Sequence, residues 1–228
     1  MPKTSKRYRS TSAKLVAGKS YTPAEAAVLL KDAPTKFDGS VELHIRLGID
    51  PKKSDQSVRG SVQLPHGTGK TKRVIAFVGS NHEAEAKAAG ADIIGTAEVI
   101  QQIKTTGKID FDVAIATPDM MKQLAPVARI LGQKGLMPNP KTETVGPDVS
   151  KMILALKAGK VNFKNDATCN IHLAIGRVSF SPEQLEANAK AAIEAIRKAK
   201  PASSKGTYLR SVTLASTMGP GIPLSVTA

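Results

Sequence analysis

The chain has 228 residues and a formal net charge of +14, from 33 lysines and arginines against 19 aspartates and glutamates, and this surplus favours a polyanionic partner, most often nucleic acid. Hydrophobic residues make up 41% of the chain and charged residues 23%, which excludes collagen-like and disordered proteins. At roughly 100 to 200 residues per domain, we expect one large domain or two modest ones.

Residues 1–67 are predicted to hold a loose basic arm, a helix and two strands. The arm is explained equally well by a solvated tail and by a segment that binds polyanions, and its basic residues are Lys3, Lys6, Arg7, Arg9, Lys14 and Lys19. Residues 22–25, TPAE, supply an N-cap, a first-turn proline and a glutamate that closes a capping box, so we expect a helix there that reaches Leu30. Alternating apolar residues predict half-buried strands at 41–47 and 58–64.

The pattern changes in residues 68–159, because apolar runs now alternate with helical segments. Residues 74–78 form a nearly continuous apolar run, which predicts a buried strand. The elements predicted after it are a helix at 81–89, a strand at 93–94, a helix at 97–104, a strand at 113–116, a helix through 131 and a helix at 148–158. This alternation indicates a parallel sheet covered by helices on both faces, as in Rossmann-like layers.

From residue 160 the alternating pattern returns. Strands are predicted at 161–164, 171–180 and 208–215, and residues 181–184, SPEQ, open a long helix that ends near Pro201.

The two ends of the chain resemble each other in strand type and charge more than either resembles the middle. We therefore predict an α/β protein of two domains, a split α+β sandwich and an inserted Rossmann-like three-layer domain. The sandwich, an antiparallel sheet with helices, is predicted from residues 1–67 and 160–228, and the inserted domain from residues 68–159, with hinges at the two chain crossings.

The aromatic content narrows the kind of nucleic acid. Five Phe, three Tyr and no Trp leave few rings for stacking once a core is built, so a binder of single strands is disfavoured. Structured RNA read through its backbone and 2′-hydroxyls, or duplex DNA read through its phosphates, fits better.

No catalytic or metal-binding set stands out. The string GKT at 69–71 matches the end of a P-loop, but Leu64 stands where the motif needs its first glycine, and a predicted strand follows where a helix is required. An interdomain turn is the better interpretation. Cys169 and His172 are three apart in a predicted strand and therefore lie on opposite faces. We expect no metal, no cofactor and no enzymatic activity.

The cell compartment is indicated by features that are missing. A single cysteine cannot make an internal disulfide, and no apolar stretch follows the basic N-terminus, so we expect no secretory leader and a reducing, cytoplasmic setting. Residues 211–228 carry no charge but contain two prolines and two glycines, so we expect no membrane span.

Two polar loops of the split domain carry large apolar side chains. They are Lys36-Phe37 and Thr217-Met218-Gly219. Either apolar side chain could plug the core. Alternatively, backbone and hydroxyl groups of these loops meet ribose while the Met218 thioether packs on sugar faces. The residues alone leave both interpretations open.

Several longer strings resemble the bacterial ribosomal protein L-one family. In chain order they are TKFD at 35–38, HIRLGIDP at 44–51, LPHGTGK at 64–70, GLMPNPK at 135–141 and STMGP at 216–220. The resemblance covers nearly the whole chain and implies the mobile stalk protein of the large ribosomal subunit, with a split RNA-binding domain and an inserted Rossmann-like domain. It also implies partners: large-subunit rRNA, deacylated exit-site tRNA whose release the protein assists, its own operon mRNA whose translation it represses, and other components of the large subunit.

The residues that match the family's RNA surface are Lys36, Phe37, Glu42, Asp166, Thr168, Ser211, Thr217, Met218 and Gly219. The resemblance implies that Glu42, Ser211 and Thr217 exchange hydrogen bonds with 2′-hydroxyls, with the Glu42 carboxylate as an acceptor, and such bonds would distinguish RNA from DNA. Cys169 departs from the family, in which a glycine usually follows Thr168, so a side chain stands where a close approach or a positive φ favours glycine.

Some interpretations stay open. In the inserted domain, Arg129, Lys134 and Lys141 lie among glycines and prolines, where a second RNA surface and a solvated loop are equally good explanations. An enzyme acting on a phosphorylated substrate through the inserted domain is supported only by fold analogy. A duplex-DNA regulator would bind a DNA copy of the RNA target as tightly as the RNA.

Overall fold

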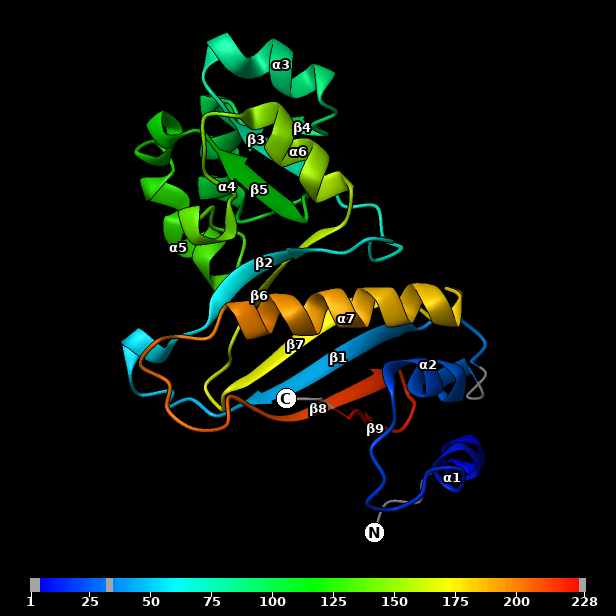
Figure 1. Ribbon diagram of the computed structural model, residues 1–228. Helices are drawn as coiled ribbons and strands as arrows, with labels where there is room; N and C mark the ends of the chain where they lie inside the picture. The colour runs from blue at the N-terminus through cyan, green and yellow to red at the C-terminus, as the bar shows by residue number, and fades with distance from the viewer. Residues whose placement is uncertain (1–4, 32–34, 226–228) are drawn as a thin grey trace. The chain divides into compact units, whose positions relative to one another are not determined.

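The chain divides into two compact units. The computed structural model (Figure 1) describes residues 5–31 and 35–225, apart from the side chain of residue 54. Unit 1 is Met1–Gly69 with Val161–Ala228, and unit 2 is Lys70–Lys160. That the units are independently folding domains stays a prediction. Lys3 of the predicted basic arm lies outside the described residues.

Unit 1 is built on an antiparallel sheet. Its strands, in spatial order, are β7 (Asn170–Arg177), β1 (Ser40–Leu47), β8 (Leu209–Ser216) and β9 (Ile222–Pro223). Alternate residues of β1, such as Leu43 and Ile45, are buried in a core that helices α2 (Pro23–Lys31) and α7 (Pro182–Lys198) also supply. Both helices lie along this sheet in Figure 1. The other face of the sheet therefore remains for polar side chains.

A smaller sheet and two short helical segments complete unit 1. The sheet pairs β2 (Arg59–Gln63) with β6 (Lys160–Lys164), and the helical segments are α1 (Lys6–Ser12) and the 3-10 turn η1 (Ser54–Gln56). The sequence did not indicate α1, whose N-cap is Ser5; the Ser5 hydroxyl accepts a hydrogen bond from the Tyr8 amide.

Predicted capping residues account for both large helices. At α7 the Ser181 hydroxyl accepts from the Gln184 amide at 3.2 Å, while the Gln184 side chain accepts from the Ser181 amide at 3.0 Å. At α2 the Glu25 carboxylate accepts from the Thr22 amide at 2.9 Å. These reciprocal bonds satisfy amides that have no partner within the helix.

Unit 2 has the predicted parallel sheet with helices on both faces. The strand order is β4 (Ile93–Ile94), β3 (Val74–Phe77) and β5 (Val113–Ala116). Ile75 and Phe77 pack on one side with helices α4 (Ala97–Thr106) and α5 (Ala128–Gln133). Val74 and Ala76 pack on the other side with α3 (Glu83–Ala88) and α6 (Val149–Lys157). The α/β fold class is confirmed.

The continuous helix predicted to run through residue 131 is wrong. The chain forms two 3-10 turns, η3 (Pro118–Met121) and η4 (Ala125–Val127), before α5. Pro126 has no amide hydrogen to donate within a helix and clashes with the preceding turn, which explains the break. Short 3-10 turns also occur as η2 (Ser80–His82) and η5 (Pro140–Thr142).

A buried asparagine fixes the turn where the chain leaves unit 1. Asn188 of α7 is fully buried, accepts from the His66 amide at 3.1 Å, and donates to the carbonyls of Gly67 and Ile175 at 2.9 and 2.7 Å.

The GKT string at 69–71 is followed by strand β3 and not by the helix that a P-loop requires, so the P-loop alternative is wrong. Within the described residues, no helix is both long and apolar enough to cross a membrane.

Candidate nucleic-acid interface

The exposed face of the main sheet is a regular array of side chains, which we call the polar array. Strand register defines its rows, which are Asn170, Arg46 and Ser211, then His172, His44 and Thr213, then Ala174, Glu42 and Ala215. Every member is exposed or half-buried. Because side chains alternate along a strand, the residues between these nine point into the core. The core packing of unit 1 thus holds these side chains on one face of the sheet.

Two segments at one end of the array are tied together, and we call them the loop edge (residues 35–40 and 216–219). The Thr217 hydroxyl accepts from the Ser40 amide at 3.0 Å and donates to the Ser40 carbonyl at 3.1 Å. The Thr217 amide donates to the same carbonyl at 2.9 Å. The two segments, 177 residues apart in sequence, therefore form one surface.

The loop edge presents two large apolar side chains to solvent. Phe37 is 53% exposed and Met218 is 68% exposed, so the core-plug interpretation is wrong for both. Met218 also has φ of +66°, a left-handed conformation that costs a non-glycine residue energy. At Gly219 an added Cβ would lie 2.3 Å from the Ser216 hydroxyl, so a larger residue would fit only if that hydroxyl moved away.

Asp38 anchors the Phe37 segment to the end of β7. Its carboxylate accepts from the Ser179 amide at 3.0 Å and from the Ser179 hydroxyl at 2.9 Å. The Arg177 guanidinium donates to the Asp38 carbonyl at 2.9 Å. These bonds hold the exposed ring of Phe37 in place without burying it.

A second edge of the array is the loop of residues 165–169, built around one carboxylate. Asp166 accepts from the amides of Asn170 and Thr168 at 2.7 and 2.8 Å and from the Thr168 hydroxyl at 2.8 Å. The Asn170 amide and the Thr168 hydroxyl lower the pKa of Asp166 below its ordinary value. Asn165 fastens the loop to unit 1 by accepting from the Val58 amide at 2.8 Å.

Cys169 adopts a backbone conformation that favours glycine. Its φ is +65°, a value that glycine adopts without strain. The side chain is buried, and the thiol donates to the Ile49 carbonyl at 3.2 Å. The turn therefore accommodates a cysteine side chain in the core of unit 1.

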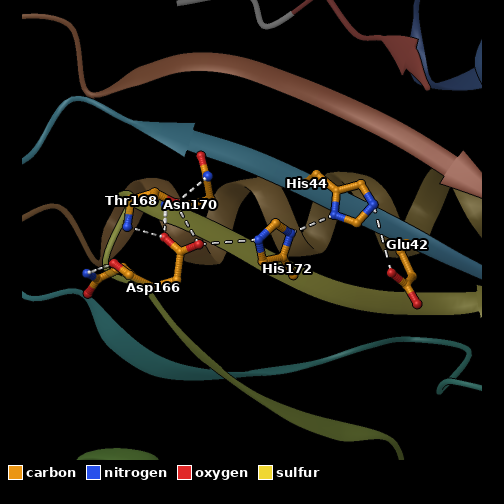
Figure 2. A network of polar contacts seen from close by, with 7 residues as sticks. Glu42, His44, Asp166, Thr168, Asn170 and His172 are labelled. Atoms are coloured by element: carbon orange, nitrogen blue, oxygen red, sulfur yellow. Dashed lines mark hydrogen bonds and ion pairs between the residues drawn. The ribbon is translucent and has the colours of Figure 1, made fainter. Parts of the chain in front are cut away.

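Two histidines in the middle row of the array contact each other directly. The Nδ1 atoms of His44 and His172 lie 2.8 Å apart. Figure 2 shows them between two carboxylates, with Glu42 beside His44 and Asp166 beside His172. Burial, followed by the neighbouring His172, lowers the pKa of His44.

The predicted site residues fall into two sets. All nine predicted RNA contacts lie in unit 1: Lys36, Phe37, Thr217, Met218 and Gly219 on the loop edge, Glu42 and Ser211 in the polar array, and Asp166 and Thr168 on the second edge. Arg129, Lys134 and Lys141 lie in unit 2, on α5, just after it and in η5, and all three are exposed.

Sequence reasoning missed the five other polar members of the array: Arg46, Asn170, Thr213, and the pair His44 and His172. The signal was present, because the strand prediction for residues 41–47 already separates the face of His44 and Arg46 from the apolar face. What the sequence could not supply was the register that places β7 and β8 beside β1. Ser211 and Arg210 also line a shallow groove with Ser20 and Ser225.

Comparison with known proteins decides the family. The family described as "Ribosomal protein L1p/L10e family" matches residues 29–220. The chain belongs to this family. Three proteins named "Large ribosomal subunit protein uL1" show how far the similarity extends. The protein of Rhodococcus erythropolis is 51% identical over 98% of this chain and 94% of its own length. The protein of Mycolicibacterium smegmatis is 52% identical over 98% of this chain and 95% of its own length. The protein of Kosmotoga olearia is 53% identical over 98% of this chain and 97% of its own length.

Membership in the L1p/L10e family confirms the resemblance noted in the sequence. The chain is a ribosomal protein and not an enzyme, and its place is the ribosome in the cytoplasm. In the described part of the chain, no group of three or more His, Cys, Asp and Glu side chains is placed to hold a metal ion.

Proposed function

We propose that this protein is a component of the large ribosomal subunit that binds a structured rRNA segment with the polar array and its two edges. The names of the relatives support the assignment to the large subunit. The observation that carries the RNA site is the hydrogen-bonded contact between residues 35–40 and 216–219, which places an exposed Met218 and an exposed Phe37 beside the polar array.

The chemistry of this surface suits ribose better than bare phosphate. The Glu42 carboxylate lies in the array, where it would repel a phosphate but accept a hydrogen bond from a 2′-hydroxyl. The Ser211 hydroxyl can donate or accept, the Thr168 hydroxyl, which already donates to Asp166, can accept, and Met218 can pack on sugar faces. The overall charge of +14 then draws the RNA in, while contacts to sugars select it.

The finer roles belong to the same proposal. A segment of the operon mRNA that repeats the rRNA structure would occupy the same array, so rRNA and mRNA would compete and excess protein would repress its own translation. Release of deacylated tRNA from the exit site needs a second contact, for which the exposed Arg129, Lys134 and Lys141 of unit 2 are the candidates.

Substitutions on the loop edge test the RNA site. We expect Thr217→Ala and Met218→Asp each to weaken binding to the rRNA fragment by about 1 to 3 kcal/mol, because each removes a specific contact and Asp adds a charge that repels phosphates. Titration of labelled rRNA fragment at fixed salt measures this. Val28→Asp is the matched control for Met218→Asp, since Val28 is 53% exposed but lies on α2.

Unchanged affinity of folded Thr217→Ala and Met218→Asp proteins would rule out this surface. A DNA copy of the fragment that binds as tightly as the RNA would replace the proposal with a duplex-DNA regulator. For the second contact, neutralising Arg129, Lys134 and Lys141 together should reduce crosslinking to deacylated tRNA on ribosomes without changing affinity for the rRNA fragment.

A further inference from the structure

The contact between His44 and His172 constrains where their protons are. The two residues are directly opposite each other in antiparallel β1 and β7, with ring centroids 5.0 Å apart and an interplanar angle of 63°. A separation of 2.8 Å between two Nδ1 atoms is a hydrogen bond only if one nitrogen carries a proton and the other offers a lone pair. The pair therefore shares a single proton at its centre.

The outer nitrogens of the pair face carboxylates. The Nε2 of His44 lies 3.8 Å from the Glu42 carboxylate, and the Nε2 of His172 lies 3.6 Å from the Asp166 carboxylate. Figure 2 shows the four side chains in a continuous row across the two strands. The attraction between each carboxylate and the Nε2 that faces it is strongest when that Nε2 carries a proton.

The neutral histidine pair has one proton fewer than the number of nitrogen positions that can use one. Two neutral imidazoles carry two N–H groups, whereas this arrangement has three places for them: the centre and both outer nitrogens. One added proton fills all three places and creates one imidazolium between two carboxylates. A second added proton would put two N–H groups face to face at the centre and break the contact.

We propose that His44 and His172 act as one titrating unit that takes up one additional proton when RNA binds, and that the protonated pair positions the Glu42 carboxylate, through His44, as a hydrogen-bond acceptor for a ribose hydroxyl. The proposal rests on the RNA site proposed above and adds to it two positioning residues and a proton.

The surroundings favour one proton and disfavour two. Around the pair, the array contributes one further cation, Arg46, while β8 contributes the neutral Thr213 and Ser211. Burial, the larger cause, and His172 lower the pKa of His44, whereas Glu42 raises it; repulsion between the two histidines opposes a second positive charge in the unit. Phosphates of bound RNA add negative potential and stabilise the first proton.

The sign of the pH effect follows from this linkage. RNA binding raises the pKa of the pair above its value in the free protein, so the bridge contributes fully to affinity below the free pKa and is lost as pH rises through the RNA-bound pKa. We expect affinity to fall by about tenfold per pH unit within that window, the slope for uptake of one proton.

Two measurements on the full chain test the unit. In the free protein, histidine NMR signals of His44 and His172 should move together with one common midpoint, because they report the same proton. In RNA titrations from about pH 6 to about pH 8.5, the wild type should show the slope of one proton, whereas His44→Gln, His172→Gln and the double variant should show equally flat profiles. Gln keeps an N–H for the outer carboxylate but does not titrate.

The matched controls are His66→Gln and His82→Gln. These are the other two histidines of the chain, and because they lie outside the array, both variants should keep the wild-type slope.

Separate midpoints in the free protein, or losses of slope that add between the two single variants, would overturn the shared proton. A flat wild-type profile with tight RNA binding would overturn the proton bridge and leave the RNA site standing. Failure of every variant and of the wild type to bind RNA would refute the proposed function itself and, with it, the role given to the pair.

Discussion

Backbone strain at single residues marks the edges of the proposed RNA surface. Among the described residues, three that are not glycine have positive φ: Glu143, Cys169 and Met218. Cys169 lies on one edge of the polar array and Met218 on the other. Such strain persists where the surrounding structure imposes it, often at binding sites. At Met218 the strained residue is also the more exposed of the two large apolar side chains on the loop edge.

The strain at Cys169 can be measured by comparing two small replacements. We expect Cys169→Gly to have a free energy of unfolding about 1 kcal/mol greater than Cys169→Ala, because only glycine adopts a φ of +65° without a Cβ penalty. Both variants lose the thiol contact to Ile49, so that loss cancels in the comparison. Chemical denaturation of the two proteins gives the difference. Equal stabilities, or a more stable alanine variant, would show that the turn carries no strain.

At the scale of elements, α7 depends on its first turn. Loss of the Ser181 hydroxyl in Ser181→Ala should lower the free energy of unfolding by about 1 kcal/mol, as is typical for N-cap residues. The side chains of Ser181 and Gln184 each accept a hydrogen bond from the other residue's amide. The double variant with Gln184→Ala should therefore lose less free energy of unfolding than the two single variants added together. A double-mutant cycle in urea measures this coupling. Strict additivity would mean that the two bonds act independently.

Elements with strong local signals were predictable, and elements set by distant contacts were not. The capping residues of α2 and α7, the apolar run of β3 and the alternation of β1 each predict their element correctly. The end of β7 was placed too late, because the chain turns at residues 178–180 where Asp38 binds Ser179. The histidine pair was missed for the same reason, since the register between β1 and β7 joins residues 128 apart.

At the scale of the whole molecule, the overall positive charge and the residues proposed to contact RNA are distributed differently. Positive charge is spread over both terminal segments and the middle of the chain, whereas the polar array contains one arginine, one glutamate, two histidines and three residues with neutral hydroxyl or amide groups. Under the proposed function, long-range attraction is a property of the whole molecule, whereas selection of the RNA depends on one sheet face. This division explains why composition points to nucleic acid but cannot identify the contact residues.

The same division predicts what unit 2 contributes to rRNA affinity. Unit 1 has its own hydrophobic core, and unit 2 has two clusters of its own. We therefore expect a variant in which a short Gly-Ser linker replaces residues 70–160 to fold, and to bind the rRNA fragment within about threefold of the full chain at equal salt, since unit 2 contributes only a little long-range attraction. Adding Met218→Asp to this variant should weaken binding as much as it does in the full chain. If the variant folds but loses most of its affinity, unit 2 also makes contacts with the rRNA fragment. The salt dependence of its binding would then show whether phosphate contacts were removed.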